Sequence, residues 1–334
     1  MEYRTLGKTG LKISRLGLGG IPIQKIDKEG ARSLVDELIA ESVNFIDTAR
    51  GYTVSEEYLG YALEGVRDKF VLATKSTART REAMVEDIET SLSKLRTDYI
   101  DLYQLHNPGA KELETVLAPG GALEALLDAR EKGKIGHIGI TLHSKEMFEA
   151  VLDLPWVETV MFPYNIVETQ GEDLIKRCEE KNIGFICMKP LAGGAIDDPI
   201  TAMRFIASNP SVTVIIPGMA DKSEISMNVS AISNISPLTE DERAKVDAIR
   251  DSLGTNFCRR CNYCAPCTVG INISAILLFE GYYNRYGLRD WAKDRYSKLD
   301  KKATDCIECG VCEERCPYNL PIREMLKRSA GVLE

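Results

Sequence analysis

Eight short apolar runs, each typical of a buried strand, follow one another along the chain from residue 16 onward, and amphipathic helical segments separate them. The runs are Leu16–Gly19, Asn44–Asp47, Phe70–Thr74, Ile100–His106, Ile135–Thr141, Thr159–Phe162, Gly184–Met188 and Thr213–Pro217. Continuous apolar strands that alternate with helices form parallel sheets covered by helices. Eight such units predict an α/β fold of the (β/α)8 TIM barrel type. A doubly wound sheet is the alternative, but no Gly-x-Gly-x-x-Gly motif follows the first run.

The second feature is a group of cysteines near the C-terminus: the chain has 10 Cys, and eight of them lie between residues 258 and 316. In a Cys-x-x-Cys-x-x-Cys run that ends in a fourth Cys before Pro, three thiolates hold one four-iron cluster and the fourth ligates the neighbouring cluster. The spacing therefore predicts two [4Fe-4S] clusters with crossed ligand sets. One set is Cys258, Cys261, Cys264 and Cys316, and the other is Cys306, Cys309, Cys312 and Cys267.

Two departures keep other interpretations of the cysteines open. The first run has two residues rather than three before its last Cys, and Thr268 stands where Pro is usual. Structural zinc is the alternative metal, because Cys-x-x-Cys pairs also form Cys₄ zinc sites. Disulfides are disfavoured, because the N-terminus carries charges and lacks the apolar stretch of a secretion signal. The stretch Thr268–Asp305 looks helical, so we expect a mostly helical ferredoxin-like module.

Composition narrows the class of protein further. A net charge of −8 and a pI of about 5.3 disfavour nucleic acid as a partner. No apolar run is long enough to span a bilayer, so we expect a cytoplasmic protein without a membrane contact. The composition shifts at Phe257, which predicts a barrel over residues 1–252 and a cluster-binding module over residues 253–334.

Polar side chains stand at the ends of several predicted strands, among them Asp47, Lys75, His106 and Asn165. In a barrel the carboxyl ends of the strands meet on one face, where active sites lie. A Tyr with a pKa near 10 becomes a better acid or base when an ammonium group lowers that pKa. Tyr52 is therefore a candidate proton donor, with Lys75 as its cation, Asp47 holding the Lys, and His106 positioning a substrate oxygen.

The residues Asp47-Thr-Ala-Arg-Gly-Tyr52-Thr-Val-Ser-Glu-Glu-Tyr-Leu59-Gly60, followed by a strand-end Lys75 and a strand-end Leu-His106, resemble the aldo-keto reductases. The one change in the first motif is Thr53 for the usual Gly. The resemblance covers residues 1 to about 252, and the cysteine tail points to the iron–sulfur-containing branch. It implies an NAD(P)-dependent oxidoreductase that reduces a carbonyl or oxidises an alcohol, with the same roles for the four residues.

The resemblance also implies an NAD(P)H site across the barrel mouth. The implied contacts are Gly20, Asp47, Thr141, Ser144, Asn165, Pro190, Leu191, Gly193, Gly218, Lys222, Glu224 and Asn228. The chain departs from the family at Thr141-Leu142, where Ser-Asn is common, at Met161 for Gln, and at Met188 for the nicotinamide-stacking Tyr. Glu224 stands where an Arg would grip the 2′-phosphate of NADP, so we expect NADH to be used at least as well as NADPH.

Three functions fit these patterns. The first is hydride chemistry coupled to electron transfer through the two clusters, with a ferredoxin or another electron carrier as a candidate partner. The second is the same hydride chemistry with purely structural clusters. The third is a nicotinamide-binding electron-transfer or redox-sensing protein, which the complete set of four catalytic residues disfavours. The substrate is expected to contact the segments Pro108–Gly121 and Ala195–Pro199, which do not identify it. His137 is expected to be structural and His143 to face the site.

Overall fold

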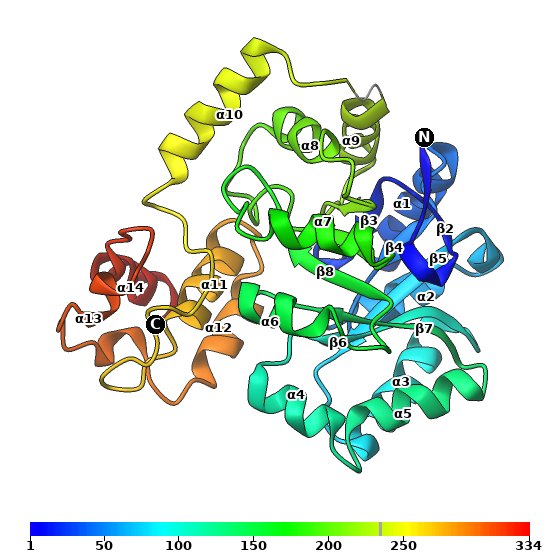
Figure 1. Cartoon of the computed structure of the whole chain (residues 1–334), viewed down its shortest axis with the longest axis horizontal. Helices are drawn as coiled ribbons and strands as arrows, with labels where there is room; N and C mark the ends of the chain where they lie inside the picture. The colour runs from blue at the N-terminus through cyan, green and yellow to red at the C-terminus, as the bar shows by residue number, and fades with distance from the viewer. Residues whose placement is uncertain (234–235) are drawn as a thin grey trace.

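A closed barrel of eight parallel strands forms the larger part of the computed structural model, which describes residues 1–233 and 236–334 (Figure 1). The strands are β3 (Gly17–Gly19), β4 (Phe45–Asp47), β5 (Val71–Ser76), β6 (Ile100–His106), β7 (Ile135–Thr141), β8 (Thr159–Pro163), β9 (Gly184–Met188) and β10 (Val214–Ile216). They lie side by side in chain order. Parallel bridges from Leu16 to Ile215 and from Gly19 to Gly218 join the first strand to the last. The predicted (β/α)8 barrel is therefore confirmed.

The strands are apolar because side chains cover both of their faces. An inner cluster that includes Phe45, Leu102 and Ile186 fills the barrel, and a larger outer cluster lies between the strands and the helices. Leu6 and Ile13 also belong to the inner cluster. They come from an N-terminal hairpin of β1 (Tyr3–Thr5) and β2 (Lys12–Ser14), which the sequence pattern did not predict. This hairpin closes the bottom of the barrel with apolar side chains.

Helices follow the strands and cover the outside of the barrel (Figure 1). They are α1 (Lys28–Ala40), α2 (Ser55–Ala62), α3 (Arg81–Leu95), α4 (Ala110–Leu117), α5 (Ala122–Glu131), α6 (Lys145–Val151), α7 (Glu172–Glu180), α8 (Pro199–Ala207) and α9 (Lys222–Ser233). Side-chain caps explain several starts, because Asp27, Thr80 and Asp198 each accept a hydrogen bond from a backbone amide of the first turn. Among the described residues, no helix combines the length and the apolar character needed to cross a bilayer.

The C-terminal part of the chain forms a second, mostly helical body, as expected. After α10 (Glu240–Leu253) come α11 (Ile273–Asn284), α12 (Arg289–Ser297), α13 (Val311–Glu314) and α14 (Ile322–Leu333). This body has its own core, which includes Ile276, Leu326 and the thiols of Cys312 and Cys316. Figure 1 shows it beside the barrel.

The C-terminal body contacts the loops that leave the carboxyl ends of the barrel strands. Arg259 donates a hydrogen bond to the carbonyl of Val167 at 2.8 Å, and Arg285 donates to the carbonyl of Gly193 at 2.9 Å. Val167 follows β8 and Gly193 follows β9. Because the active face of a barrel lies at these strand ends, the C-terminal body becomes part of the wall around the candidate site.

Candidate active site and cluster sites

A buried ion pair lies at the ends of β4 and β5. Lys75 donates hydrogen bonds from Nζ to Asp47 Oδ1 and, at 2.7 Å, to the carbonyl of Thr48. Gln104, on the neighbouring β6, donates from Nε2 to Asp47 Oδ2 at 3.0 Å. Burial raises the pKa of Asp47 and lowers that of Lys75, and the attraction between the two charges opposes both shifts. Gln104 was not among the residues predicted from the sequence, because a buried amide inside a strand has no motif of its own.

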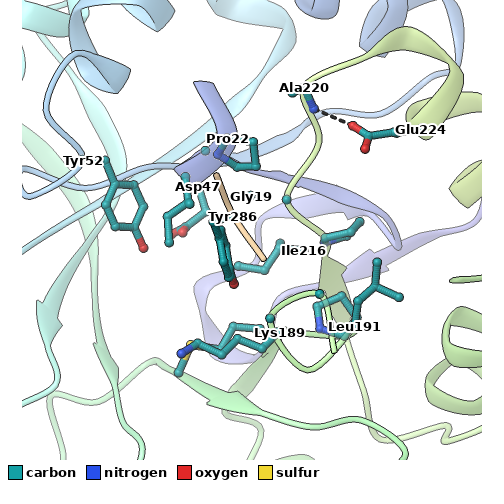
Figure 2. Close-up of a pocket in the computed structure, with 18 of the residues that line it drawn as sticks. Gly19, Pro22, Asp47, Tyr52, Lys189, Leu191, Ile216, Ala220, Glu224 and Tyr286 are labelled. Carbon is teal, nitrogen blue, oxygen red and sulfur yellow. Dashed lines mark hydrogen bonds between the residues drawn. The ribbon is translucent and has the colours of Figure 1, made fainter. Parts of the chain in front are cut away.

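Tyr52 and His106 lie on the open side of this pair. Their rings meet edge to face with centroids 6.3 Å apart, and Lys75 Nζ lies 5.0 Å from the centroid of the Tyr52 ring. Figure 2 shows the Tyr52 hydroxyl pointing into the pocket near Asp47. The structure therefore brings together the four residues that were predicted to be catalytic, from the ends of three strands and the loop after β4.

The pKa of Tyr52 shifts in the direction opposite to the one we expected. Burial raises this pKa well above 10, and the negative charge of Asp47 raises it further, as do Tyr282 and Tyr286. Arg295 is the group that opposes the shift. Lys75 Nζ lies over the Tyr52 ring, and Asp47 balances its charge. The net shift is therefore upward, opposite to the lowered pKa that was predicted, and Tyr52 carries its proton at neutral pH.

Both histidines near the site are held in the neutral form. Burial lowers the pKa of His106 well below 6.5, and the charges of Lys75, Arg79, Arg295 and Lys189 lower it further. Burial likewise lowers the pKa of His143, whose Nδ1 is buried without a hydrogen-bond partner. A neutral imidazole can donate a hydrogen bond to a carbonyl oxygen without adding a charge.

His137 lies apart from this site. Its Nδ1 is 2.8 Å from Oε1 of Glu158, which also accepts a hydrogen bond from the backbone of Ile138. The role of this histidine is therefore to pair with a neighbouring carboxylate at the start of β8, as the sequence analysis expected.

A pocket of about 250 Å³ opens beside Tyr52 (Figure 2). Loops after β3, β9 and β10 form most of its wall. Of the residues predicted to contact NAD(P)H, those that line the pocket are Gly20, Asp47, Pro190, Leu191, Gly193, Gly218 and Glu224. Met161 and Met188, two of the departures from the family pattern, line it as well.

The other predicted contacts lie outside the lining of this pocket. Thr141 accepts a hydrogen bond from the amide of Asn107 at 3.1 Å, and Ser144 caps α6. Asn165 is buried and donates from Nδ2 to Glu168 at 2.7 Å and to the carbonyl of Lys189 at 2.9 Å. Lys222 lies 3.7 Å from a carboxylate oxygen of Glu37. These four side chains therefore contact other residues of the chain and do not line the pocket.

Several features of the pocket fit a dinucleotide. Oδ1 of Asn228, on α9 and outside the lining of this pocket, is buried without a partner, as it would be if a ligand amino group completed its hydrogen bonding. A Cβ atom at Gly218 would lie 2.8 Å from Pro22 Cγ, so the absence of a side chain there keeps the pocket open. Lys25 and Arg285 line the pocket and supply positive charge for phosphates.

Glu224 has a local role that the sequence did not reveal. Its Oε2 accepts hydrogen bonds from the amides of Ala220 at 2.6 Å and Asp221 at 3.1 Å (Figure 2). The carboxylate therefore satisfies backbone donors at the start of α9, while it also lines the pocket.

Residues of the C-terminal body reach the pocket, which the sequence analysis missed. Arg285 and Tyr286 line it, and the Tyr286 hydroxyl would lie 3.2 Å from a Cβ at Gly193. Arg295 lies close enough to affect the pKa of both Tyr52 and His106. The one signal in the sequence is a run of aromatic residues in and around α11, most of which pack in or against the core of the C-terminal body.

Two small cavities in the C-terminal body are each lined by four cysteines. One is lined by Cys258, Cys261, Cys264 and Cys316, and the other by Cys267, Cys306, Cys309 and Cys312. These are the two crossed sets that the spacing predicts. Within residues 1–233 and 236–334, no three His, Cys, Asp or Glu side chains converge into a site for a single metal ion. Sulfur atoms around a cavity suit a polynuclear cluster better than one zinc ion.

The two cysteine sets lie in different surroundings. Beside the first, Arg260 pairs with the fully buried Glu168 of the barrel at 2.9 Å, and its charge acts on both Cys258 and Lys189. In the second, Cys309 is exposed, and its Sγ lies 3.2 Å from Oγ1 of Thr268. The first set therefore adjoins the barrel, and the second reaches the surface.

Comparison with known proteins agrees with this geometry. Residues 15–201 match the model of the aldo/keto reductase family, and residues 257–321 match a 4Fe-4S dicluster domain. L-galactose dehydrogenase from Arabidopsis thaliana is 26% identical over 302 residues, which cover 75% of this chain and 94% of that protein. Aldo-keto reductase YhdN from Bacillus subtilis (strain 168) is 32% identical over 194 residues, 52% of this chain and 57% of the relative. The holo form of aldo-keto reductase AKR11C1 from Bacillus halodurans shares the fold, with 24% identity, a TM-score of 0.64, and coverage of 75% of this chain and 96% of that one.

Proposed function

The chain belongs to the aldo/keto reductase family, and from that premise we propose that it is a nicotinamide-dependent oxidoreductase that reduces a small-molecule carbonyl or oxidises the corresponding alcohol. The observation that carries the proposal is the protonated Tyr52 hydroxyl at the pocket, beside the buried Asp47–Lys75 pair and the neutral His106. When bound, NAD(P)H supplies the hydride. Gly20, Gly193 and Gly218 in the pocket lining, and the orphan acceptor of Asn228 on α9, support nucleotide binding at the barrel mouth.

The chain's own groups would perform the proton transfer and the positioning. His106 donates a hydrogen bond to the carbonyl oxygen, and Tyr52 gives that oxygen its proton. Lys75 and Gln104 hold Asp47, which keeps the residues behind Tyr52 in one arrangement. The loops and the C-terminal body exclude water from the reacting atoms.

The chain also carries a 4Fe-4S dicluster domain, and we propose that it holds two clusters with the crossed ligand sets described above. The proposed division of the chain is residues 1–252 for the barrel and residues 253–334 for the cluster module. Exposed Cys309, with Ile307 63% exposed nearby, favours electron exchange with an external carrier. The contacts of the module with the pocket equally support a structural role. Eight thiolate ligands need a reducing compartment, so we propose a cytoplasmic location.

Kinetics of a single-atom variant test the enzyme proposal. Tyr52→Phe removes the hydroxyl that donates the proton, and we expect carbonyl reduction by NADH to fall by about 10²–10⁴-fold. Tyr61→Phe is the matched control, because it removes a hydroxyl that binds Glu29 on the outside of the barrel. Reduction by Tyr52→Phe at near the parent rate would reject the role of Tyr52.

Crossed substitutions test the cluster ligands. Anaerobically purified protein is expected to contain about eight iron and eight sulfide per chain if two cubane clusters are present. Cys267→Ser should perturb the electron paramagnetic resonance signal of the cluster held by the second cysteine run, and Cys316→Ser that of the first. Cys178→Ser, in the barrel core, is the control. Stoichiometric zinc without iron would contradict the proposal.

A further inference from the structure

Two positive charges beside the candidate catalytic residues have no ion-pair partner within the part of the chain that the structure describes. They belong to Arg295 on α12 and Lys189 after β9, and both act on the pKa of His106. Among the described residues, neither the Arg295 guanidinium nor the Lys189 ammonium forms an ion pair or donates a hydrogen bond to a protein group. Nearby Lys75 and Arg79 are different, because each is paired with a carboxylate.

The surroundings of Arg295 hold its side chain while leaving its donors free. The guanidinium carbon lies 4.4 Å from the centroid of the Trp291 ring, and that ring packs on Tyr282. Its Nη2 lies 3.6 Å from where a Cβ of Gly51 would be, one residue before Tyr52. Its Nε is buried without a hydrogen-bond partner. A stacked guanidinium whose N–H groups have no partner can donate hydrogen bonds to a carboxylate or phosphate.

Lys189, which follows β9 and lines the pocket, also acts on His106. Its φ of 56° is in the left-handed region, which a non-glycine residue keeps only when its surroundings require it. Figure 2 shows its side chain extended along the pocket, on the same side as Tyr52 and away from Glu224. Burial lowers the pKa of this ammonium, and repulsion from Arg260 lowers it further. An anion beside it would relieve both effects.

We propose that the substrate carries an anionic group, a carboxylate or a phosphate, that Arg295 binds with help from Lys189 while the carbonyl oxygen lies at Tyr52 and His106. This inference rests on the proposed carbonyl reductase function and adds the class of substrate to it. The phosphates of the nucleotide do not account for Arg295. Lys25 and Arg285, which line the pocket, are available for those phosphates. Lys189 also lines the pocket, on the side of Tyr52, whereas Arg295 is not part of that lining. The C-terminal module therefore contributes a specificity residue to the barrel.

Paired substrates that differ in charge test the inference on the cluster-loaded protein. The probes are 4-carboxybenzaldehyde, 4-formylphenyl phosphate and the uncharged methyl ester of the first. We expect kcat/KM to favour one or both anions over the ester by at least about tenfold, and Arg295→Met to lower kcat/KM for that anion by roughly 10–100-fold. The ester should be little affected. Arg295→Lys should restore much of the preference, because it restores the charge.

The matched control is Arg289→Met, which removes an exposed guanidinium stacked on Tyr283 from the same helix. It should leave the preference for anions unchanged. An unchanged preference in Arg295→Met, or an equal loss for the ester and the anions, would overturn the inference. Whichever anion is preferred identifies the class as carboxylate or phosphate.

A binding measurement separates this inference from the proposed reaction. Calorimetric titration with benzoate, inorganic phosphate and benzamide, in the presence of NAD, needs no turnover. Arg295-dependent binding of an anion together with inactivity toward all three aldehydes would support the anion site and reject the reductase proposal. Reduction of the aldehydes without a preference for charge, and with benzoate and phosphate binding no tighter than benzamide, would reject the anion site and leave the reductase proposal standing.

Discussion

The pH dependence of carbonyl reduction is the most direct test of the electrostatics at Tyr52. Burial and the charge of Asp47 raise the pKa of this phenol above 10, so at pH 7 no more than about 0.1% of it is phenolate. The proton donor therefore stays loaded throughout the neutral range. His106, with its pKa well below 6.5, stays neutral over the same range. We expect kcat/KM for reduction to be level between about pH 7 and pH 10.

Alcohol oxidation should behave differently, because it needs the phenolate as the base. Its kcat/KM should rise by about tenfold for each pH unit up to pH 10, since the fraction of phenolate rises by that factor below the pKa. Arg295→Met removes a cation that lowers the pKa of Tyr52, so the end of this rise should move to higher pH. Tyr52→Phe should lose both the rate and the slope.

The assay follows nicotinamide absorbance at constant ionic strength in both directions. Comparing NADH with its 4-deuterated form identifies the pH range in which the chemical step limits the rate, and the profile is interpreted only there. An ionisation with an apparent pKa between about 7 and 9 that lowers the reduction rate in the parent protein, and that disappears in Tyr52→Phe, would refute the argument. It would mean that Lys75 lowers the phenol pKa after all.

Further predictions concern other contacts. Lys75→Met leaves Asp47 buried without its cation, so the free energy of unfolding in denaturant should fall by about 3–5 kcal/mol; adding Asp47→Asn should recover part of that stability but not the rate. Thr268→Val removes the hydroxyl beside the exposed thiolate of Cys309, and a redox titration should show the midpoint of the outer cluster lowered by roughly 30–60 mV, with Thr268→Ser close to the parent. Glu224→Arg should shift the ratio of dissociation constants about tenfold toward NADPH; an NADPH dissociation constant more than tenfold below that for NADH in the parent protein would contradict our interpretation of Glu224. Removing iron with a chelator should weaken nucleotide binding, because the module lines the pocket; unchanged binding in calorimetry would show that its contacts do not depend on the clusters.

Local patterns in the sequence were enough to predict the barrel and much of the site. The bounds of β6, β7 and β9 agree with the predicted runs, because continuous apolar segments have few alternatives to a strand buried on both faces. The Cys spacing predicted which four thiols surround each cavity, because the short loops between them limit how far each sulfur can reach. Strand-end polar residues converge in every barrel, so the meeting of Tyr52 and His106 also followed from the order of strands.

Tertiary contacts decided the remaining features, since these depend on residues far apart in the chain. The approach of Arg285, Tyr286 and Arg295 to the pocket results from docking of one body on another, for which a single sequence carries no periodic signal. The pKa of Tyr52 depends on the depth of burial and on the sum of several charges, both of which exist only in the folded chain. For the same reason Glu224 could be predicted as a nucleotide contact from its position in the sequence, but the backbone amides that it satisfies followed only from the turn that begins α9.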